Sequence, residues 1–244
     1  QWLVSTINKS YNMHYMSKIL HHATIIAKKN NHIAIEKSDI AHAMDTAEWG
    51  YYNNNPSIEL NYNTIISFHE IGHAITLLAQ KDSLNTVEYI SLRPNHHNHA
   101  GTVIYEKEDE DHEKPLSIKN IFAFINTLLA GPLTEELFFN TASFFHHKND
   151  LERAREYANM IAKTILLNKG LSITAENIAK ESNHIIQQCT EKTKSILKKN
   201  ACIIPLLAKQ LEEKKVLLAE DIFSTIDQYN KTVSTDNKII LGLL

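Results

Sequence analysis

The segment that most constrains this chain is a helix-like stretch, residues 63–81, that is apolar on nearly every side yet carries His69, Glu70 and His73. The side chains around these three are mostly aliphatic: Ile65, Ile66, Phe68, Ile71, Ala74, Ile75, Leu77, Leu78 and Ala79. A helix that is apolar all round lies in a protein core, where polar side chains need partners. Residues four apart share one helix face, so both imidazoles can reach a single metal ion. The H-E-x-x-H pattern therefore predicts a buried metal-binding helix.

Histidine is abundant, with 14 among 244 residues, so the pattern could also arise by chance on a helix with two surface histidines. The apolar residues around the motif favour the metal-binding interpretation. Charged residues make up 22% of the chain and the net charge is −3, as in soluble globular proteins. The sequence has no basic stripe, so we do not expect a nucleic-acid partner. Two cysteines are too few for a disulfide framework. No apolar run reaches the roughly 20 residues of a membrane span, so we expect this chain itself to be soluble.

The chain is predicted to be mainly α, because only 6 glycines and 5 prolines punctuate it and apolar residues recur at helical spacing. Two β-forming runs, residues 86–93 and 101–106, predict a small hairpin with a long loop. A polar, proline-bearing stretch, residues 51–62, is the best linker. The helical segments are expected at residues 14–30, 38–50, 63–81, 117–130, 132–139, 150–169, 174–199, 201–214 and 220–230.

A catalytic zinc site needs a third protein ligand besides two histidines, with one position left open. A histidine six residues after the second is absent, because position 79 is Ala. Glu135 or Glu136, on a downstream helix, would give one common ligand set, and Asp150 would give another. Spacing alone does not separate these choices.

Several strings resemble the FtsH-type ATP-dependent zinc metalloproteases (AAA proteases). Residues 69–74, HEIGHA, look like the family's HEAGHA, and residues 129–137, LAGPLTEEL, are similar to LGGRAAEEL. Residues 149–154, NDLERA, resemble the family's Asn-Asp pair followed by Leu or Ile and then Ala three residues later. Residues 206–222 look like the family's C-terminal helices, and residues 19–49 are similar to the final helices of the AAA lid. The motifs follow the family's order over nearly the whole chain.

The resemblance implies a zinc-dependent endopeptidase. His69, His73 and Asp150 would bind Zn²⁺, and Glu70 would be the general base. Glu136, in preference to its neighbour Glu135, would be the carboxylate that orients a ligand histidine.

The resemblance also implies that Gly101, Thr102 and Val103 lie on an edge strand that binds extended substrate. One departure from the family is Pro132, which predicts a helix break at residue 131.

The implied organisation is a helical AAA-lid remnant (1–50), a linker (51–62), a helical zinc-peptidase domain with the hairpin (63–230) and a tail (231–244). No G-x-x-x-x-G-K-S/T motif occurs in the chain, so ATP would act only through a module outside it. The resemblance implies a hexameric ring that degrades unfolded or membrane proteins. The resemblance also implies that the full-length protein is membrane-associated, with its peptidase domain on the cytoplasmic or organelle-matrix side. The alternative is a degenerate, non-proteolytic relative that serves as a ring scaffold or substrate-binding module.

Overall fold

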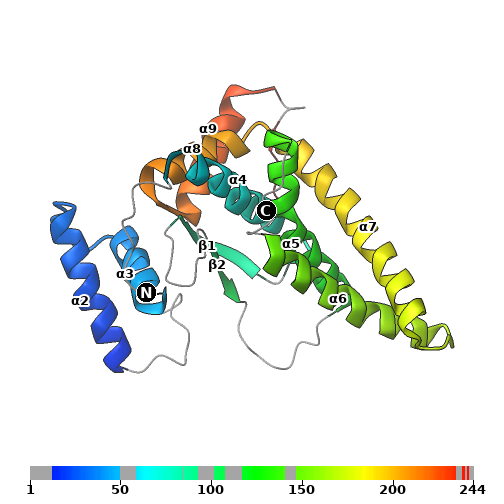
Figure 1. The fold of residues 1–244 in the computed structure, drawn as a ribbon. Helices are drawn as coiled ribbons and strands as arrows, with labels where there is room; N and C mark the ends of the chain where they lie inside the picture. The colour runs from blue at the N-terminus through cyan, green and yellow to red at the C-terminus, as the bar shows by residue number, and fades with distance from the viewer. Residues whose placement is uncertain are drawn as a thin grey trace.

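The computed structural model describes residues 13–49, 59–83, 85–92, 102–107, 117–140, 147–234, 238–239 and 241. This part of the chain is mainly helical with one small antiparallel sheet, which confirms the predicted fold class (Figure 1). The helices are α2 (Met13–Lys29), α3 (Lys37–Trp49), α4 (Glu59–Leu78), α5 (Ile118–Phe139), α6 (His147–Asn168), α7 (Ala175–Lys199), α8 (Ile204–Lys214) and α9 (Ala219–Thr232). The strands are β1 (Asn85–Ser91), β2 (Thr102–Lys107) and β3 (Val216–Leu218).

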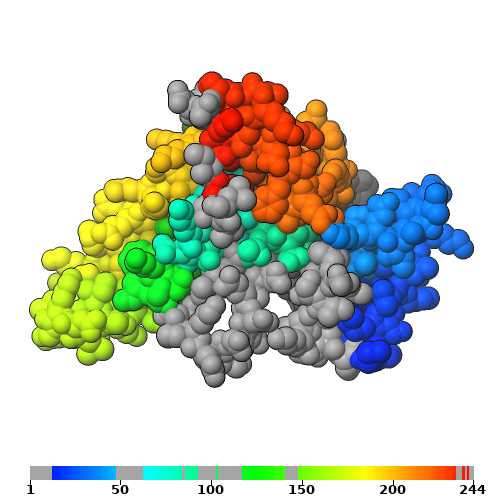
Figure 2. Space-filling model, turned by 180° about the vertical axis from the view of Figure 1, so that it is seen from behind, coloured from blue at the N-terminus to red at the C-terminus, as the bar shows by residue number. Residues whose placement is uncertain are grey.

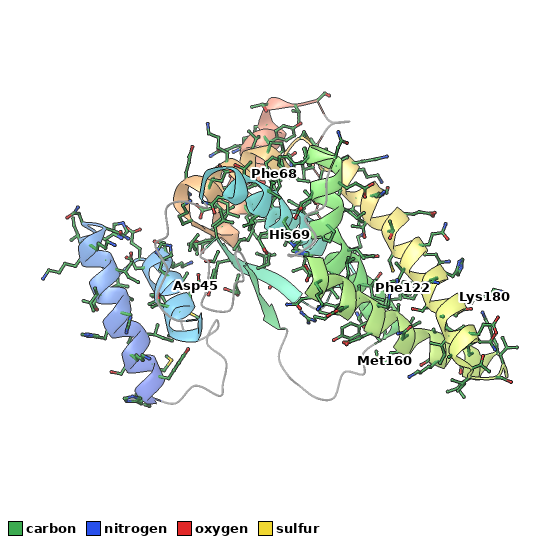
Figure 3. The ribbon with its side chains drawn as sticks, in the orientation of Figure 1. Asp45, Phe68, His69, Phe122, Met160 and Lys180 are labelled. Carbon is green, nitrogen blue, oxygen red and sulfur yellow. The ribbon has the colours of Figure 1, made fainter. Side chains whose placement is uncertain are left out.

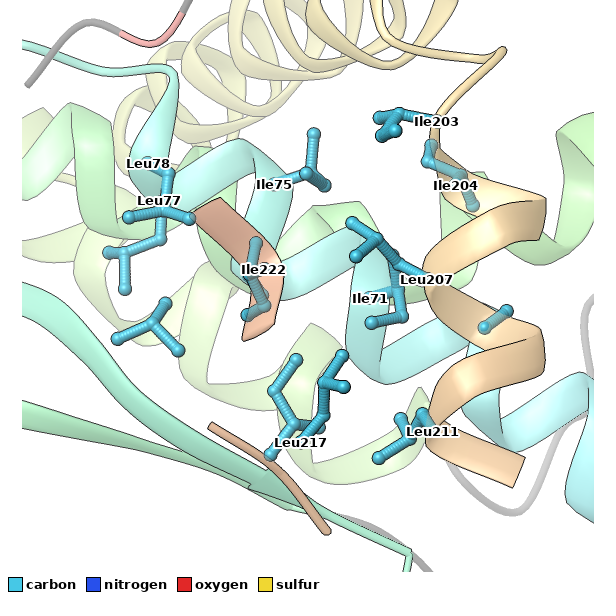
Figure 4. Packing of buried hydrophobic residues seen from close by; sticks show 14 of the residues in the cluster. Ile71, Ile75, Leu77, Leu78, Ile203, Ile204, Leu207, Leu211, Leu217 and Ile222 are labelled. Atoms are coloured by element: carbon cyan, nitrogen blue, oxygen red, sulfur yellow. The ribbon is translucent and has the colours of Figure 1, made fainter. Parts of the chain in front are cut away.

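Helix α4 is the central element, with α8 on one side, α5 on the other and the sheet beside it (Figure 1). The main core lies where α4, α8, α9 and the sheet meet (Figure 4), and its largest fully buried side chains include Ile71, Ile75 and Ile203. A second core joins α5, α6 and α7 and includes Ile125, Ala158 and Ile185, one from each helix. The predicted burial of the motif helix is thus confirmed, and α4 contributes to both the core and the α5 interface.

The sheet has the order β2-β1-β3. The predicted hairpin is confirmed: β1 and β2 pair antiparallel from Asn85 opposite Lys107 to Ser91 opposite Thr102, with an irregularity between Val87 and Tyr89. Strand β3 was not predicted, because three residues between two helices are too few to show strand periodicity. It pairs antiparallel with β1 and leaves β2 at the edge of the sheet.

The structure differs from several expected helix boundaries, whereas the division into domains stays a prediction. Helix α4 begins at Glu59, so the last four residues of the predicted linker are helical. Helix α5 continues through Pro132, which is buried with much of the helix around it. Proline removes only one N–H, and packing of α5 against α4, α6 and α7 holds the turns on both sides. Residues Ile239 and Leu241 of the predicted tail are buried in the main core, where Asn230 hydrogen-bonds the backbone N and O of Ile239.

Helix α5 is also long and apolar enough to span a membrane by length and composition, the one such helix among the described residues. However, 56% of that stretch is buried inside the protein. Its contacts with α4, α6 and α7 make it a core helix here.

The N-terminal helix pair, α2 and α3, has a small core of its own around Ile19, Ala23 and Met44. It lies at the opposite end of the molecule from the α6–α7 hairpin (Figures 1 and 2). Buried Asp45 of α3 accepts hydrogen bonds from Tyr89 and Ser91 of β1 and so joins the pair to the sheet (Figure 3). The predicted boundary between the N-terminal unit and the rest stays a prediction.

Candidate metal centre

Two glycines allow α4 and α5 to approach closely at the motif. A Cβ added to Gly72 of α4 would lie 2.1 Å from Thr134 Oγ1 and 3.0 Å from the Ala130 carbonyl oxygen of α5. A Cβ added to Gly131 of α5 would lie 2.4 Å from His69 Nε2 and 2.6 Å from His73 Nε2. The bare backbone of Gly131 therefore forms one wall of the site, in contact with both imidazoles.

The three predicted metal ligands converge on one point. The Nε2 atoms of His69 and His73 are 2.9 Å apart, and each lies 3.3 Å from Asp150 Oδ2. A tetrahedral zinc ion with bonds of about 2.1 Å holds its ligand atoms roughly 3.4 Å apart, close to the two longer sides of this triangle. Figure 3 shows His69 where α4 meets α5. The described residues contain one such group of three metal-binding side chains, and this is that group.

Asp150 comes from the first turn of α6, which begins at His147 rather than at Asp150 as expected. One turn later, on the same face, the small Ala154 is fully buried, and Ala158 follows it. These alanines pack against Ile125 and Leu129 of α5. The α5–α6 contact therefore brings the carboxylate of Asp150 to the histidines, 77 residues after His73 in the chain.

Both imidazoles are held by their other nitrogen. His69 Nδ1 lies 2.8 Å from Glu135 Oε1, and His73 Nδ1 lies 2.7 Å from the carbonyl oxygen of Thr127. Both acceptors require Nδ1–H as donor, which leaves the Nε2 lone pairs directed into the triangle. Metal-binding histidines are commonly anchored in this way, with the tautomer and ring orientation fixed by the second contact.

The carboxylate that orients a ligand histidine is Glu135, so the predicted choice of Glu136 was wrong. Glu135 is 1% exposed, whereas Glu136 lies on the outer side of α5 and pairs with Lys194 of α7 at 3.0 Å. The helical period could have identified Glu135 from the sequence, because positions 131 and 135 are four apart and share a helix face. Once Gly131 is placed against the imidazoles, Glu135 must point the same way.

The electrostatics of the site favour a bound positive charge. Burial alone would lower the pKa of His69, but hydrogen bonds to Asp150 and Glu135 and the nearby charge of Glu70 outweigh it and raise the pKa to about 10. Burial also opposes ionisation of Asp150, yet the two histidines lower its pKa below the usual range. Two lone pairs 2.9 Å apart beside a carboxylate need a cation between them, either a proton or a metal.

Glu70, the predicted general base, is 7% exposed and follows His69 on α4. Burial raises the pKa of its carboxyl group above the usual range, opposed by the two histidines. A carboxylate with a raised pKa takes up a proton more readily near neutral pH. The environment therefore suits a group that accepts a proton and returns it.

Of the predicted substrate-binding residues, Gly101 lies outside the described part of the chain. Thr102 begins β2 opposite Ser91, and Val103 is partly buried against the main core. Strand β2 has β1 as its one neighbour in the described sheet. Its role in substrate binding stays a prediction.

No known family model matches this chain. Curated proteins do match it along most of its length. It is 28% identical to the ATP-dependent zinc metalloprotease FtsH 2 of Thermoanaerobacter sp. (strain X514) over 228 residues, which are 88% of this chain and 43% of that protein. It is 29% identical to FtsH of Karelsulcia muelleri and 25% identical to FtsH of Bacillus subtilis, each over 87% of this chain.

The chain spans 43%, 36% and 37% of the lengths of these three relatives. The matches agree with the motif order in the sequence and with the helical fold around the three-ligand triangle. This chain is thus related to the FtsH-type ATP-dependent zinc metalloproteases.

Proposed function

We propose that this chain is a zinc-dependent endopeptidase domain in which His69, His73 and Asp150 bind Zn²⁺ and Glu70 is the general base. The triangle of donor atoms, with sides of 2.9, 3.3 and 3.3 Å, carries this proposal. Three protein ligands with an open fourth position are typical of catalytic rather than structural zinc. The names of the relatives support zinc and proteolysis as the class of chemistry.

Zinc held there would lower the pKa of a bound water to about 7 and polarise a substrate carbonyl. The chain's own residues do the rest. Glu135 Oε1 and the Thr127 carbonyl hold the Nδ1 protons, so both Nε2 atoms stay available as ligands. Glu70 would take a proton from the attacking water on its carboxylate and deliver it to the leaving amine. Its burial keeps that proton from bulk solvent between the two transfers.

The edge position of β2 supports an extended polypeptide as the proposed substrate. An extended, unfolded polypeptide would add to β2 through main-chain hydrogen bonds at the start of that strand, where Thr102 and Val103 lie, and Gly101 stays a predicted binding residue beside them. Because the relatives are named as ATP-dependent proteases, we propose that an ATPase module outside this chain supplies the work of unfolding the substrate. A hexameric ring, membrane association and membrane-protein substrates belong to the same proposal.

The test compares zinc content and casein hydrolysis in three variants. The unaltered protein should bind about one zinc per chain and hydrolyse unfolded casein. His73→Ala should lose the metal, and Glu70→Gln should keep it but lose hydrolysis. Glu136→Gln is the matched control, because this exposed neighbour of Glu135 should change neither. Zinc absent from the unaltered protein would refute the metal centre. Hydrolysis that persists in Glu70→Gln would refute the mechanism, and zinc without hydrolysis in the unaltered protein would favour the non-proteolytic relative.

A further inference from the structure

A buried glutamine just beyond the end of α4 joins the motif helix to α5. Gln80 is 7% exposed, and its Nε2 donates to the carbonyl oxygens of Thr76 at 2.9 Å and Ala123 at 3.1 Å. The same nitrogen lies 3.3 Å from Thr127 Oγ1. Its Oε1 accepts a hydrogen bond of 2.7 Å from Asn126 Nδ2. One amide group thus contacts one residue of α4 and three residues of α5 that lie within about one turn of each other.

The residues around this amide are themselves buried and connected. Asn126 is 6% exposed and Thr127 is 8% exposed. Thr127 Oγ1 donates to the Ala123 carbonyl oxygen at 3.1 Å, and Thr193 of α7 donates to the Asn126 carbonyl oxygen at 3.2 Å. We call Gln80, Asn126 and Thr127 the amide clamp. A buried network of this kind fixes the relative position of the helices that it joins.

The amide clamp ends at the residue that anchors a ligand histidine. The carbonyl oxygen of Thr127 accepts the hydrogen bond from His73 Nδ1 at 2.7 Å. A shift of α5 along or away from α4 at Thr127 would move that oxygen and let the ring of His73 turn. The second ring, His69, is anchored independently by Glu135, two helical turns further along α5. The clamp therefore acts on one histidine and not on the other.

We propose that Gln80 is a positioning residue for His73: by fixing the α5 backbone at Thr127, it holds the Nε2 atom of His73 in place for the metal. This inference rests on the proposed zinc site. Gln80 does not contact the three donor atoms, so it acts only through Thr127. An alternative of pure stabilisation predicts loss of stability without a selective effect on His73.

The test uses Gln80→Leu, which has a similar size but neither donates nor accepts, and Gln80→Glu, which can still accept from Asn126 but has at most one hydrogen to donate to the two carbonyls. Removal of a direct anchor of a metal-binding histidine typically costs 10–100-fold in metal affinity. Gln80 acts one contact further away, so we expect zinc affinity to fall by roughly three- to tenfold in both variants. Zinc affinity is measured by competition with a chelator, well below the unfolding midpoint.

The decisive readout is the NMR signal of the imidazole Nδ1–H protons, recorded with and without zinc. In Gln80→Leu the His73 signal should shift and exchange faster with solvent, while the His69 signal stays in place. Thr225→Val is the matched control. It removes buried hydrogen bonds to Gln210 and to the Asp221 carbonyl at the α8–α9 contact, and should change neither signal nor zinc affinity.

The outcomes separate the two proposals. If the unaltered protein binds no zinc, the proposed function fails, whereas the His73 signal of the metal-free protein still tests the clamp. If the unaltered protein binds zinc and Gln80→Leu changes neither its affinity nor the His73 signal, the positioning role of Gln80 is refuted. If both ring signals change alike, the effect is general loosening and the inference is also refuted.

Discussion

Gly131→Ala should weaken zinc binding at least about 100-fold while leaving the protein folded. The new methyl carbon would lie 2.4 Å from His69 Cε1 and Nε2 and 2.6 Å from His73 Nε2. Ordinary contacts between such atoms are about 3.5 Å or more, so each ring would have to retreat by roughly 1 Å. The rings are ends of side chains, but both are anchored at Nδ1 and cannot turn away freely. Either the anchors break or α5 moves away from α4.

This overlap should lower both the free energy of unfolding and the affinity for zinc. Overpacking a buried contact typically costs about 1–3 kcal/mol of unfolding free energy. A ligand atom displaced by roughly 1 Å is half a zinc–nitrogen bond length out of place, so we expect zinc affinity to fall at least about 100-fold. The loss of affinity, about 2.7 kcal/mol or more, should thus be comparable to or larger than the loss of stability.

Two other glycines provide controls. Gly72→Ala makes an even closer overlap at the same helix contact, 2.1 Å from Thr134 Oγ1, and this overlap is with Thr134 and Ala130 of α5. The Cβ added by Gly170→Ala would have no atom within 4 Å, so this substitution only strains the backbone of residue 170, whose φ is +65°. Urea unfolding gives the stability of each variant, and chelator competition gives zinc affinity. A Gly131→Ala protein that binds zinc as tightly as Gly72→Ala does would refute the argument that the Gly131 backbone shapes the site.

Three further outcomes are expected. Glu135→Ala should weaken zinc binding by about 10–100-fold, whereas Glu136→Ala should change it by less than about twofold, as chelator competition would show. Asp45→Ala removes the acceptor of two buried hydroxyl groups of β1 and should lower the unfolding free energy by about 1–3 kcal/mol with zinc content unchanged, as urea unfolding would show. The hydrogen bond to Asp39 raises the pKa of His32, so the stabilising effect of this pair is complete below about pH 6.5 and is lost as the pH rises through the raised value. His32→Ala should therefore destabilise the protein more at about pH 5.5 than at about pH 9, and equal urea midpoint shifts would contradict this.

The sequence predicted those parts of the fold that depend on the pattern of apolar and polar residues within one segment. The apolar surface around the motif predicted the burial of α4. The segment expected at residues 174–199 is α7, and the hydroxyl of its cap residue, Thr174, accepts a hydrogen bond from the Asn177 backbone. The hairpin followed from two β-forming runs. These features depend on residues within one or two turns of each other, so a single segment contains enough information.

The features that were missed depend on distant partners. Strand β3 exists because β1 offers it an edge. Ile239 is buried because it packs in the main core with residues of α4, α8 and α9. No local pattern marks the Thr127 carbonyl as a histidine anchor, because the anchor is a backbone atom. Glu135 and Glu136 are chemically identical neighbours, and only the orientation of α5 distinguishes them.

The orientation of α5 has a simple basis. Thr127, Gly131 and Glu135 are spaced four apart, so they form one face of α5 over two turns. In order along that face they provide the anchor of His73, the open wall against both rings and the anchor of His69. The H-E-x-x-H helix thus supplies the spacing of the two histidines, and the matching four-residue spacing on α5 supplies their orientation. Two helices with the same period, crossing at Gly72 and Gly131, are what make the paired imidazoles a site.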